Sequence, residues 1–248
     1  MQASPTLTDR EAPLPAASSC PARDAVWIAC GPLALILFLI FLAASLFLPP
    51  INPKSSPASV SDHYRDSETG MKAGIYLLAV ASILWPMYSF GLNNFLSNIP
   101  EINPNILALQ SSCGAAAGMS LAVIAPCFAA TSYRLERDPI LTELLNDLSW
   151  LMFTVVTSPF VAQEFAISLG ILSDTRAKPM IPHWVAWVNS SLTITYIPAY
   201  SAHCVREGPF AWDGAVTFWL PIAAIGVQTS LLCFYFFMYL RRRSACQG

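Results

Sequence analysis

Long apolar runs separated by short polar segments dominate the chain of 248 residues. About 20 consecutive apolar residues are enough for a helix to cross the hydrocarbon layer of a membrane. The first run, VWIACGPLALILFLIFLAASLFL, ends at Pro49-Pro50. The pattern predicts six spanning helices, with five or seven as the alternatives. Their expected ranges are 26–48, 72–96, 105–131, 142–172, 183–205 and 214–240.

The predicted fold class is therefore all-α, a polytopic transmembrane helix bundle of about six spans. Residues 1–24 are rich in Pro, Ala, Ser and Thr and have no apolar period, so we expect a disordered N-terminal tail. Residues 25–241 are expected to form a single transmembrane helical domain. Residues 242–248 are expected to be a short basic C-terminal tail.

Composition agrees with a membrane location. Hydrophobic residues are 55% and charged residues 11% of the chain, whereas a soluble domain has roughly a quarter charged residues. The net charge of -2 gives no reason to expect a nucleic-acid partner. The partners that this composition indicates are membrane lipid and, as a hypothesis, a hydrophobic small-molecule substrate.

Recognised cofactor and metal motifs are missing from the sequence. The seven cysteines form no CxxC pair and no Cys/His group with metal-ligand spacing. The chain also has no Gly-rich phosphate loop, HExxH or GxSxG. We therefore predict no cofactor and no metal.

Lysines and arginines beside the spans bear on orientation. With six spans, both chain ends lie on one side, which holds seven of these residues against six on the other. The first set is Arg10, Arg23, Arg176, Lys178, Arg241, Arg242 and Arg243, and the second is Lys54, Arg65, Lys72, Arg134, Arg137 and Arg206. The cluster at 241–243 abuts the last span and favours a cytoplasmic C-terminus.

Glu164 is the acid that lies deepest in the apolar pattern. It is eight residues from the expected helix end at Leu172, which corresponds to about 12 Å. An unpaired, unhydrated carboxylate at that depth is unfavourable, since placing a charged side chain at the centre of a membrane helix costs ~3 kcal/mol. Protonation, an ion pair or hydration removes most of this cost. Either Glu164 is a functional acid, or it is a protonated side chain that holds neighbouring helices together.

Asp147 and Asp213 are the other candidate catalytic acids. Asp147 and Glu143 are four residues apart on one helix face, where acids also stabilise a helix N-terminus. Asp213, in GPFAWDG, is placed to cap the sixth helix or to face a cavity. If residues 142–172 form one helix, Asp147 and Glu164 could reach one cavity at different depths.

The span 183–205 is the most polar of the predicted spans, and it should face the bundle interior. Aromatic and histidine side chains in and near it are candidates for substrate binding. These candidates are Trp150, Trp184, Trp187, Tyr196, His203 and Trp212. In the third span, the spacing of Gly114 and Gly118 predicts close helix packing.

Three segments resemble a pattern found in a poorly characterised group of polytopic membrane proteins. They are RDPILTELLNDLSWLMF, PHW at 182–184 and GPFAWDG, and together they cover Arg137 to Leu220. The resemblance implies a membrane topology and no particular activity.

Three functions remain open on the sequence. The first is an intramembrane enzyme that uses acid–base chemistry on a prenyl-, sterol- or polyketide-like molecule in lipid or secondary metabolism, with Glu164 as the acid and Asp147 or Asp213 as a second group. The second is a transporter or channel for a small solute or protons, because prolines interrupt several spans. The third is a non-catalytic membrane scaffold or accessory subunit.

Overall fold

The computed structural model describes residues 21–245, so the tail predicted at the N-terminus lies almost entirely outside the described residues. Over those residues the structure is helical and contains no strand, which confirms the all-α fold class. The elements are α1 (Pro21–Ala44), α2 (Pro57–Asp66), α3 (Glu68–Leu96), α4 (Pro104–Ser132), α5 (Pro139–Val155), α6 (Ser158–Leu172), α7 (His183–Ile194), the 3₁₀ helix η1 (Ile197–His203), the π-helix η2 (Ala215–Trp219) and α8 (Leu220–Ala245).

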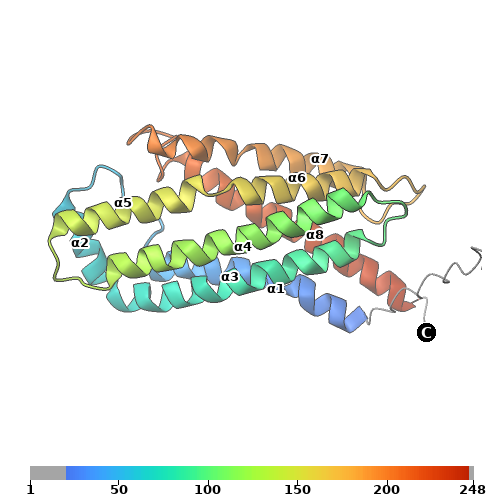
Figure 1. Ribbon diagram of the computed structural model, residues 1–248, viewed down its shortest axis with the longest axis horizontal. Helices are drawn as coiled ribbons and strands as arrows, with labels where there is room; N and C mark the ends of the chain where they lie inside the picture. The colour runs from blue at the N-terminus through green and yellow to red at the C-terminus, as the bar shows by residue number, and fades with distance from the viewer. Residues whose placement is uncertain (1–20, 246–248) are drawn as a thin grey trace, which may run out of the picture.

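Five helical segments are long and apolar enough to cross a membrane. They are Asp24–Ala44, Glu68–Leu96, Pro104–Ser132, Pro139–Leu172 and Ala215–Arg241. The fifth predicted span, 183–205, is not one continuous helix. It is divided between α7 and η1, which together run back along the bundle (Figure 1).

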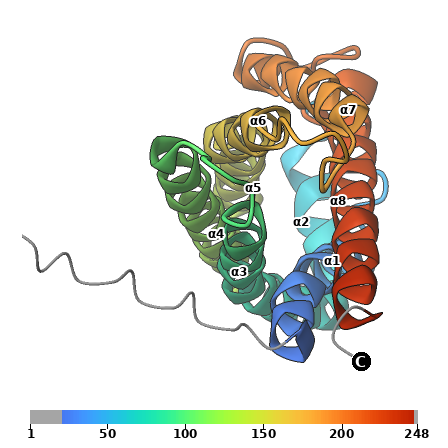
Figure 2. The ribbon, with the colours of Figure 1, turned by 90° about the vertical axis from the view of Figure 1, so that its right-hand side faces the viewer.

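The helices form a closed ring when the molecule is viewed along its long axis (Figure 2). In order round this ring, α1 packs on α3, α3 on α4, α4 on α6, α6 on α7, α7 on α8, and α8 on α1. The start of α1 and the end of α8 lie at the same end of the bundle, called here the terminal end (Figure 1). The short helix α2 lies at the other end, the α2 end, where it packs on α5.

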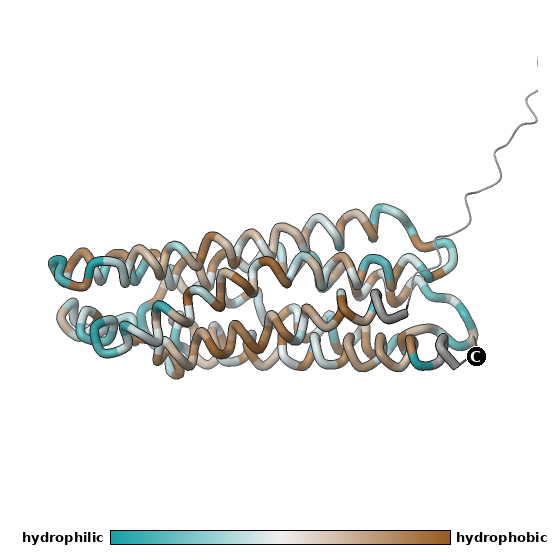
Figure 3. Tube along the Cα trace, turned by 90° about the horizontal axis from the view of Figure 1, so that it is seen from below, coloured by the Kyte–Doolittle hydropathy of each residue, from teal (hydrophilic) through white to brown (hydrophobic). Residues whose placement is uncertain are grey.

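Hydropathy follows this geometry. Apolar residues occupy the middle of the bundle, and hydrophilic residues gather at its two ends (Figure 3). Large apolar side chains are exposed on the outer surface, for example Ile83 at 64% and Phe234 at 61%. Polar side chains such as Gln110, Gln163 and Gln228 are buried. Exposed apolar side chains together with buried polar ones suit a bundle whose outer surface contacts lipid.

Small residues bring α3 and α4 together, as the spacing of Gly114 and Gly118 predicts. A Cβ atom on Gly114 would lie 1.9 Å from Ser89 Oγ, and one on Gly118 would lie 2.4 Å from Pro86 Cγ. No side chain larger than hydrogen fits at either position without movement of α3. The packing interpretation of this motif is therefore confirmed.

Loops at the α2 end are tied to one another. The N-cap of α2 is Ser56, whose side chain accepts a hydrogen bond from the Ser59 backbone. The Trp212 indole donates to the Ile51 carbonyl at 2.8 Å. These contacts hold the α1–α2 loop against the segment that precedes α8.

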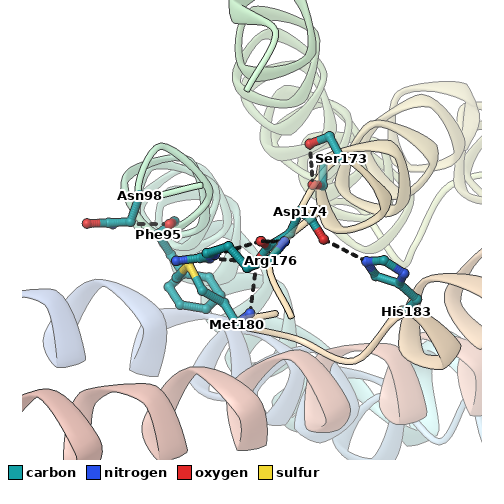
Figure 4. Close-up of polar contacts among 8 residues, drawn as sticks. Phe95, Asn98, Ser173, Asp174, Arg176, Met180 and His183 are labelled. Carbon is teal, nitrogen blue, oxygen red and sulfur yellow. Dashed lines mark hydrogen bonds and ion pairs between the residues drawn. The ribbon is translucent and has the colours of Figure 1, made fainter. Parts of the chain in front are cut away.

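At the terminal end, Asp174 organises the loop between α6 and α7 (Figure 4). Its carboxylate accepts bonds from Arg176 Nε at 2.6 Å and Nη2 at 2.5 Å, and from the Met180 backbone at 2.8 Å. Its carbonyl accepts from His183 Nε2 at 2.9 Å, at the first residue of α7. One buried residue thus fixes, through its side chain and its backbone carbonyl, where α7 begins relative to α6.

Candidate functional site

Glu164 lies in the middle of α6 and is 5% exposed. Apolar flanking residues put this turn of α6 in the bundle interior, with Ala166 and Ile167 fully buried. One of its carboxylate oxygens, Oε2, is buried and has no hydrogen-bond partner among the described residues. The prediction that this acid faces other helices rather than solvent is confirmed.

A hydrogen-bonded group links α6 to α7 and α8 around Glu164. Asn189 Nδ2 donates to the Glu164 carbonyl and to Ser168 Oγ, both at 3.0 Å. Gln228 Nε2 donates to the Asn189 carbonyl at 3.0 Å and its Oε1 accepts from the Tyr196 hydroxyl at 2.5 Å. Asn189 is 2% exposed.

A second polar group lies on the side of α6 that faces α3 and α4. Trp85 Nε1 donates to Gln163 Oε1 at 3.1 Å. Gln110 Nε2 donates to Ser89 Oγ at 3.1 Å, between α4 and α3. Since Gln163 and Glu164 are adjacent, α6 joins the two groups into one buried polar cluster, called here the Glu164 cluster.

Several atoms of the Glu164 cluster keep unused hydrogen-bonding capacity. Besides Glu164 Oε2, these are the Tyr88 hydroxyl, Gln163 Nε2 and Asn189 Oδ1. Tyr88 and Tyr196 both interact electrostatically with the Glu164 carboxyl group. Buried polar groups without partners are rare in folded proteins and are a common feature of sites that bind water, protons or ligands.

An apolar cavity of about 100 Å³ lies beside this cluster, at the centre of the ring. Residues from α1, α3, α4, α5, α6, η1, η2 and α8 line it. Its aromatic wall consists of Phe38, Trp85, Phe153, Phe160, Tyr196 and Phe218. Trp85 and Tyr196 belong to both the wall and the Glu164 cluster, so the two are adjacent.

Two prolines create the backbone breaks near the cavity. Pro159 has no N–H to donate to the carbonyl of Val155, and α5 ends at Val155. Pro198 likewise cannot donate to Ile194, where α7 ends. Residues on both breaks, Thr157 and Tyr196, line the cavity.

The three predicted catalytic acids do not converge. Asp147 lies on α5 and interacts with Asn146 and Arg206. Asp213 accepts a bond from Asn52 Nδ2 at 2.9 Å. It does not cap the last helix, because the N-cap position is Gly214. Since α5 and α6 are separate helices, Asp147 and Glu164 share no single helix face, and none of the three acids lines the cavity.

Of the predicted substrate-binding residues, Tyr196 is the one that lines the cavity. Trp184 and Trp187 are 50% and 64% exposed on the outer side of α7. The other candidates have different surroundings. Trp150 packs among Phe47, Phe128, Phe153 and Phe218, His203 is exposed at the end of η1, and Trp212 holds the Ile51 loop.

Sequence reasoning missed most of the cavity. Phe153, Phe160 and Phe218 lie in uniformly apolar segments, where nothing in the pattern separates lipid-facing from inward-facing aromatic residues. Thr154, Thr157 and Thr217 also line it. A signal was available for Thr157, because it is two residues before Pro159 in an otherwise apolar span.

Among the side chains that the structure describes, no group of three or more His, Cys, Asp or Glu residues could hold a metal ion. Comparison of the chain with protein-family models, curated sequences and solved structures gave no match. The function is therefore argued from the cavity and the Glu164 cluster alone.

Proposed function

We propose that the protein is an intramembrane enzyme that acts on a hydrophobic small molecule held in the central cavity. The observation that carries this proposal is the shared wall: Trp85 and Tyr196 line the cavity and also bond to members of the Glu164 cluster. An apolar substrate would therefore lie beside the cluster that contains Glu164, a buried acid within the described membrane spans.

The chemistry that this arrangement favours is proton transfer to and from an unsaturated hydrocarbon. A carboxyl group removed from water favours its neutral form and can act as a proton donor. Protonation of an alkene leaves a carbocation, and loss of a proton from a neighbouring carbon regenerates an alkene, so the net change is an isomerisation or cyclisation. Aromatic faces such as those of Trp85, Phe153 and Phe160 stabilise a cation within roughly 6 Å.

Glu164 does not line the cavity, so in this mechanism it supplies and recovers the proton through the Tyr196 hydroxyl on the cavity wall: the phenol passes one proton to the substrate and accepts one from the carboxyl group. Tyr196 is the group on that wall that interacts electrostatically with its carboxyl group. Gln228 and Asn189 position the phenol and the helix that carries the acid. Asp147 and Asp213 have no part in it, because neither belongs to the Glu164 cluster and neither lines the cavity.

The test replaces Glu164 by Gln, which keeps the shape and removes the titrating proton. The gene is deleted in the source organism and restored as wild type, E164Q, D147N or D213N. Hydrophobic extracts are then compared by mass spectrometry. We expect an apolar precursor to accumulate in the deletion strain and with E164Q, whose turnover should fall about 10²-fold or more. D147N and D213N should restore the wild-type extract, and an E164Q strain that also does so would refute the proposal.

A second candidate, a proton-coupled transporter, is favoured by one observation. The α5–α6 and α7–η1 breaks both adjoin the cavity and the buried acid, as broken helices do around transporter sites. Proteoliposomes decide between the two, because a transporter predicts solute-dependent proton flux that E164Q abolishes. The enzyme predicts no such flux.

We also propose that the terminal end faces the cytoplasm. Arg176 and Lys178 lie in the α6–α7 loop at that end, and Arg241–Arg243 adjoin the end of α8. Positively charged residues beside spans are retained on the cytoplasmic side.

A further inference from the structure

We propose that the cavity binds an uncharged alcohol, a hydrocarbon that ends in one hydroxyl group, with its oxygen on Thr217 Oγ1. This inference rests on the proposed function, because it names the class of substrate for the same cavity.

The cavity lining requires the ligand to be neutral. Among the lining residues that the structure describes, none is Asp, Glu, Lys, Arg or His. A phosphate, carboxylate or ammonium group placed there would lose its hydration without gaining a counter-charge. The carbon skeleton of the ligand would instead contact Leu35, Leu121, Ile124 and the aromatic wall.

One lining residue, Thr217, has a hydroxyl without a hydrogen-bond partner among the described residues, and a ligand reaches this hydroxyl when the side chain rotates toward the cavity. Thr217 is 3% exposed, lines the cavity, and its Oγ1 is buried without a hydrogen-bond partner. The other hydroxyls of the lining have acceptors. Thr154 donates to the Trp150 carbonyl at 2.9 Å, Thr157 lies 3.5 Å from the Thr154 carbonyl, and Tyr196 donates to Gln228.

The position of Thr217 in its helix explains why it differs from the others. Buried hydroxyls in this bundle usually bond to the carbonyl four residues earlier, as Thr131, Thr193 and Ser168 do. Thr217 is the third residue of η2, so the residue four places earlier, Asp213, lies in the preceding loop. A threonine hydroxyl both donates and accepts, and an alcohol completes both roles.

The cavity volume limits how much of the ligand is enclosed. About 100 Å³ is less than the roughly 150 Å³ of an engineered apolar cavity that binds benzene. In proportion, the cavity encloses roughly four non-hydrogen atoms, which are the hydroxyl oxygen and about three carbons of the ligand. We expect recognition to depend on the alcohol end and to tolerate different chain lengths.

The experiment uses the full-length protein in lipid nanodiscs with a diazirine-bearing farnesol analogue as the photoreactive probe. Labelled peptides are located by mass spectrometry. Geraniol, geranic acid and the hydrocarbon 2,6-dimethyl-2,6-octadiene compete for labelling. We expect labels on lining residues, the strongest competition from geraniol, and little from the acid.

The diagnostic variant is T217V, which keeps the side-chain shape and removes the hydroxyl. It should weaken geraniol competition about fivefold, the effect of one hydrogen bond of ~1 kcal/mol, and leave hydrocarbon competition unchanged. Two matched controls should leave both unchanged. T154V removes a cavity hydroxyl that is already bonded to its own helix, and T142V removes a buried hydroxyl without a partner on α5 outside the cavity.

Absence of labelling at the lining residues, or equal loss of geraniol competition in T217V and T154V, would overturn the inference. Binding is measured separately from turnover, so the two proposals fail separately. If the protein binds alcohols selectively but deletion of its gene leaves the hydrophobic extract unchanged, the enzyme proposal is refuted and the binding site stands. If turnover depends on Glu164 but T217V does not change geraniol competition, the binding site is refuted and the enzyme proposal stands.

Discussion

Asp174 stabilises the terminal end through four hydrogen bonds to one buried carboxylate. Its side chain is 1% exposed, whereas that of its partner Arg176 is 38% exposed. We predict that D174N lowers the stability of the purified protein by about 1–3 kcal/mol, because it weakens charge-assisted bonds from Arg176 and leaves the loop less well held. Thermal unfolding in detergent measures this. The matched control is D62N, whose carboxylate pairs with Arg65 on the exposed surface and should have little effect.

The same residue gives a pH dependence with a definite sign. The bonds from Arg176, with that from the Met180 backbone, hold the pKa of Asp174 below its ordinary value. An acid with a lowered pKa in the folded state stabilises fully above its unfolded pKa, about 3.9, and loses that contribution as the pH falls through the lowered pKa. The stability gap between wild type and D174N should therefore be constant from pH 7 to 5 and shrink below about pH 4. A gap that widens on acidification would contradict this account.

Residue by residue, burial could be predicted better for polar than for aromatic side chains. Glu164 and Asn189 are buried as expected, because an acid or amide in a membrane span must find partners inside the bundle. Trp184 and Trp187, which we predicted to bind substrate, are exposed and do not line the cavity. They are three residues apart, so they share one face of α7, and an apolar face of a membrane helix can contact lipid as well as protein. The sequence pattern does not distinguish these two environments.

At the scale of the helices, proline positions explain the main departure from the predicted spans. The sequence predicts continuous helices over 142–172 and 183–205, and each is interrupted by a proline. In both cases the proline lies four residues after the last residue of an α-helix, so it has no N–H to donate to the carbonyl of that residue. Pro86 and Pro126 lie inside α3 and α4 without ending them. A proline therefore marks a possible break, and the surrounding packing decides whether the helix continues.

The break between α5 and α6 is expected to be necessary for the cavity. Replacing Pro159 by Ala restores an N–H that can bond to the Val155 carbonyl, so the two helices should join into one. Joining them moves Val156, Thr157 and Phe160, which line the cavity. We predict that P159A reduces labelling by the farnesol probe several-fold, while thermal stability is unchanged or increases, since the substitution removes a helix break worth about 3 kcal/mol.

The control for this element is P126A. Pro126 is exposed within the uninterrupted α4 and does not line the cavity. This variant also gains an N–H in a helix, so a general effect of proline removal would appear in both proteins. If P159A were labelled as strongly as P126A, the break would not be required for the cavity.

For the whole molecule, the sequence predicts about six spans and the common side of the two chain ends. It does not predict which helices are neighbours in the ring. Six apolar segments place both chain ends on one side, and the start of α1 and the end of α8 do lie together (Figure 1). The contact between α1 and α8, which closes the ring, joins segments that are about 200 residues apart. Nothing in the local hydropathy specifies that pair, and the central cavity depends on it.

The orientation of the bundle in the membrane depends on the distribution of positive charges over the whole molecule. If the terminal end faces the cytoplasm, Cys204, which is exposed at the α2 end after η1, lies on the opposite side of the membrane from the C-terminus. We therefore predict that sealed vesicles with the cytoplasmic face outward lose a C-terminal epitope to added protease. In a variant with C20S and C246S, an impermeant maleimide should label Cys204 in the same vesicles only after detergent is added.

Replacing Arg241–Arg243 with Gln should produce a population of mixed orientation, because it removes three of the seven positive charges that hold the terminal end on the cytoplasmic side. Immediate labelling of Cys204 together with a protected epitope would reverse the assignment, and labelling unaffected by the arginine replacements would show that other charges set it.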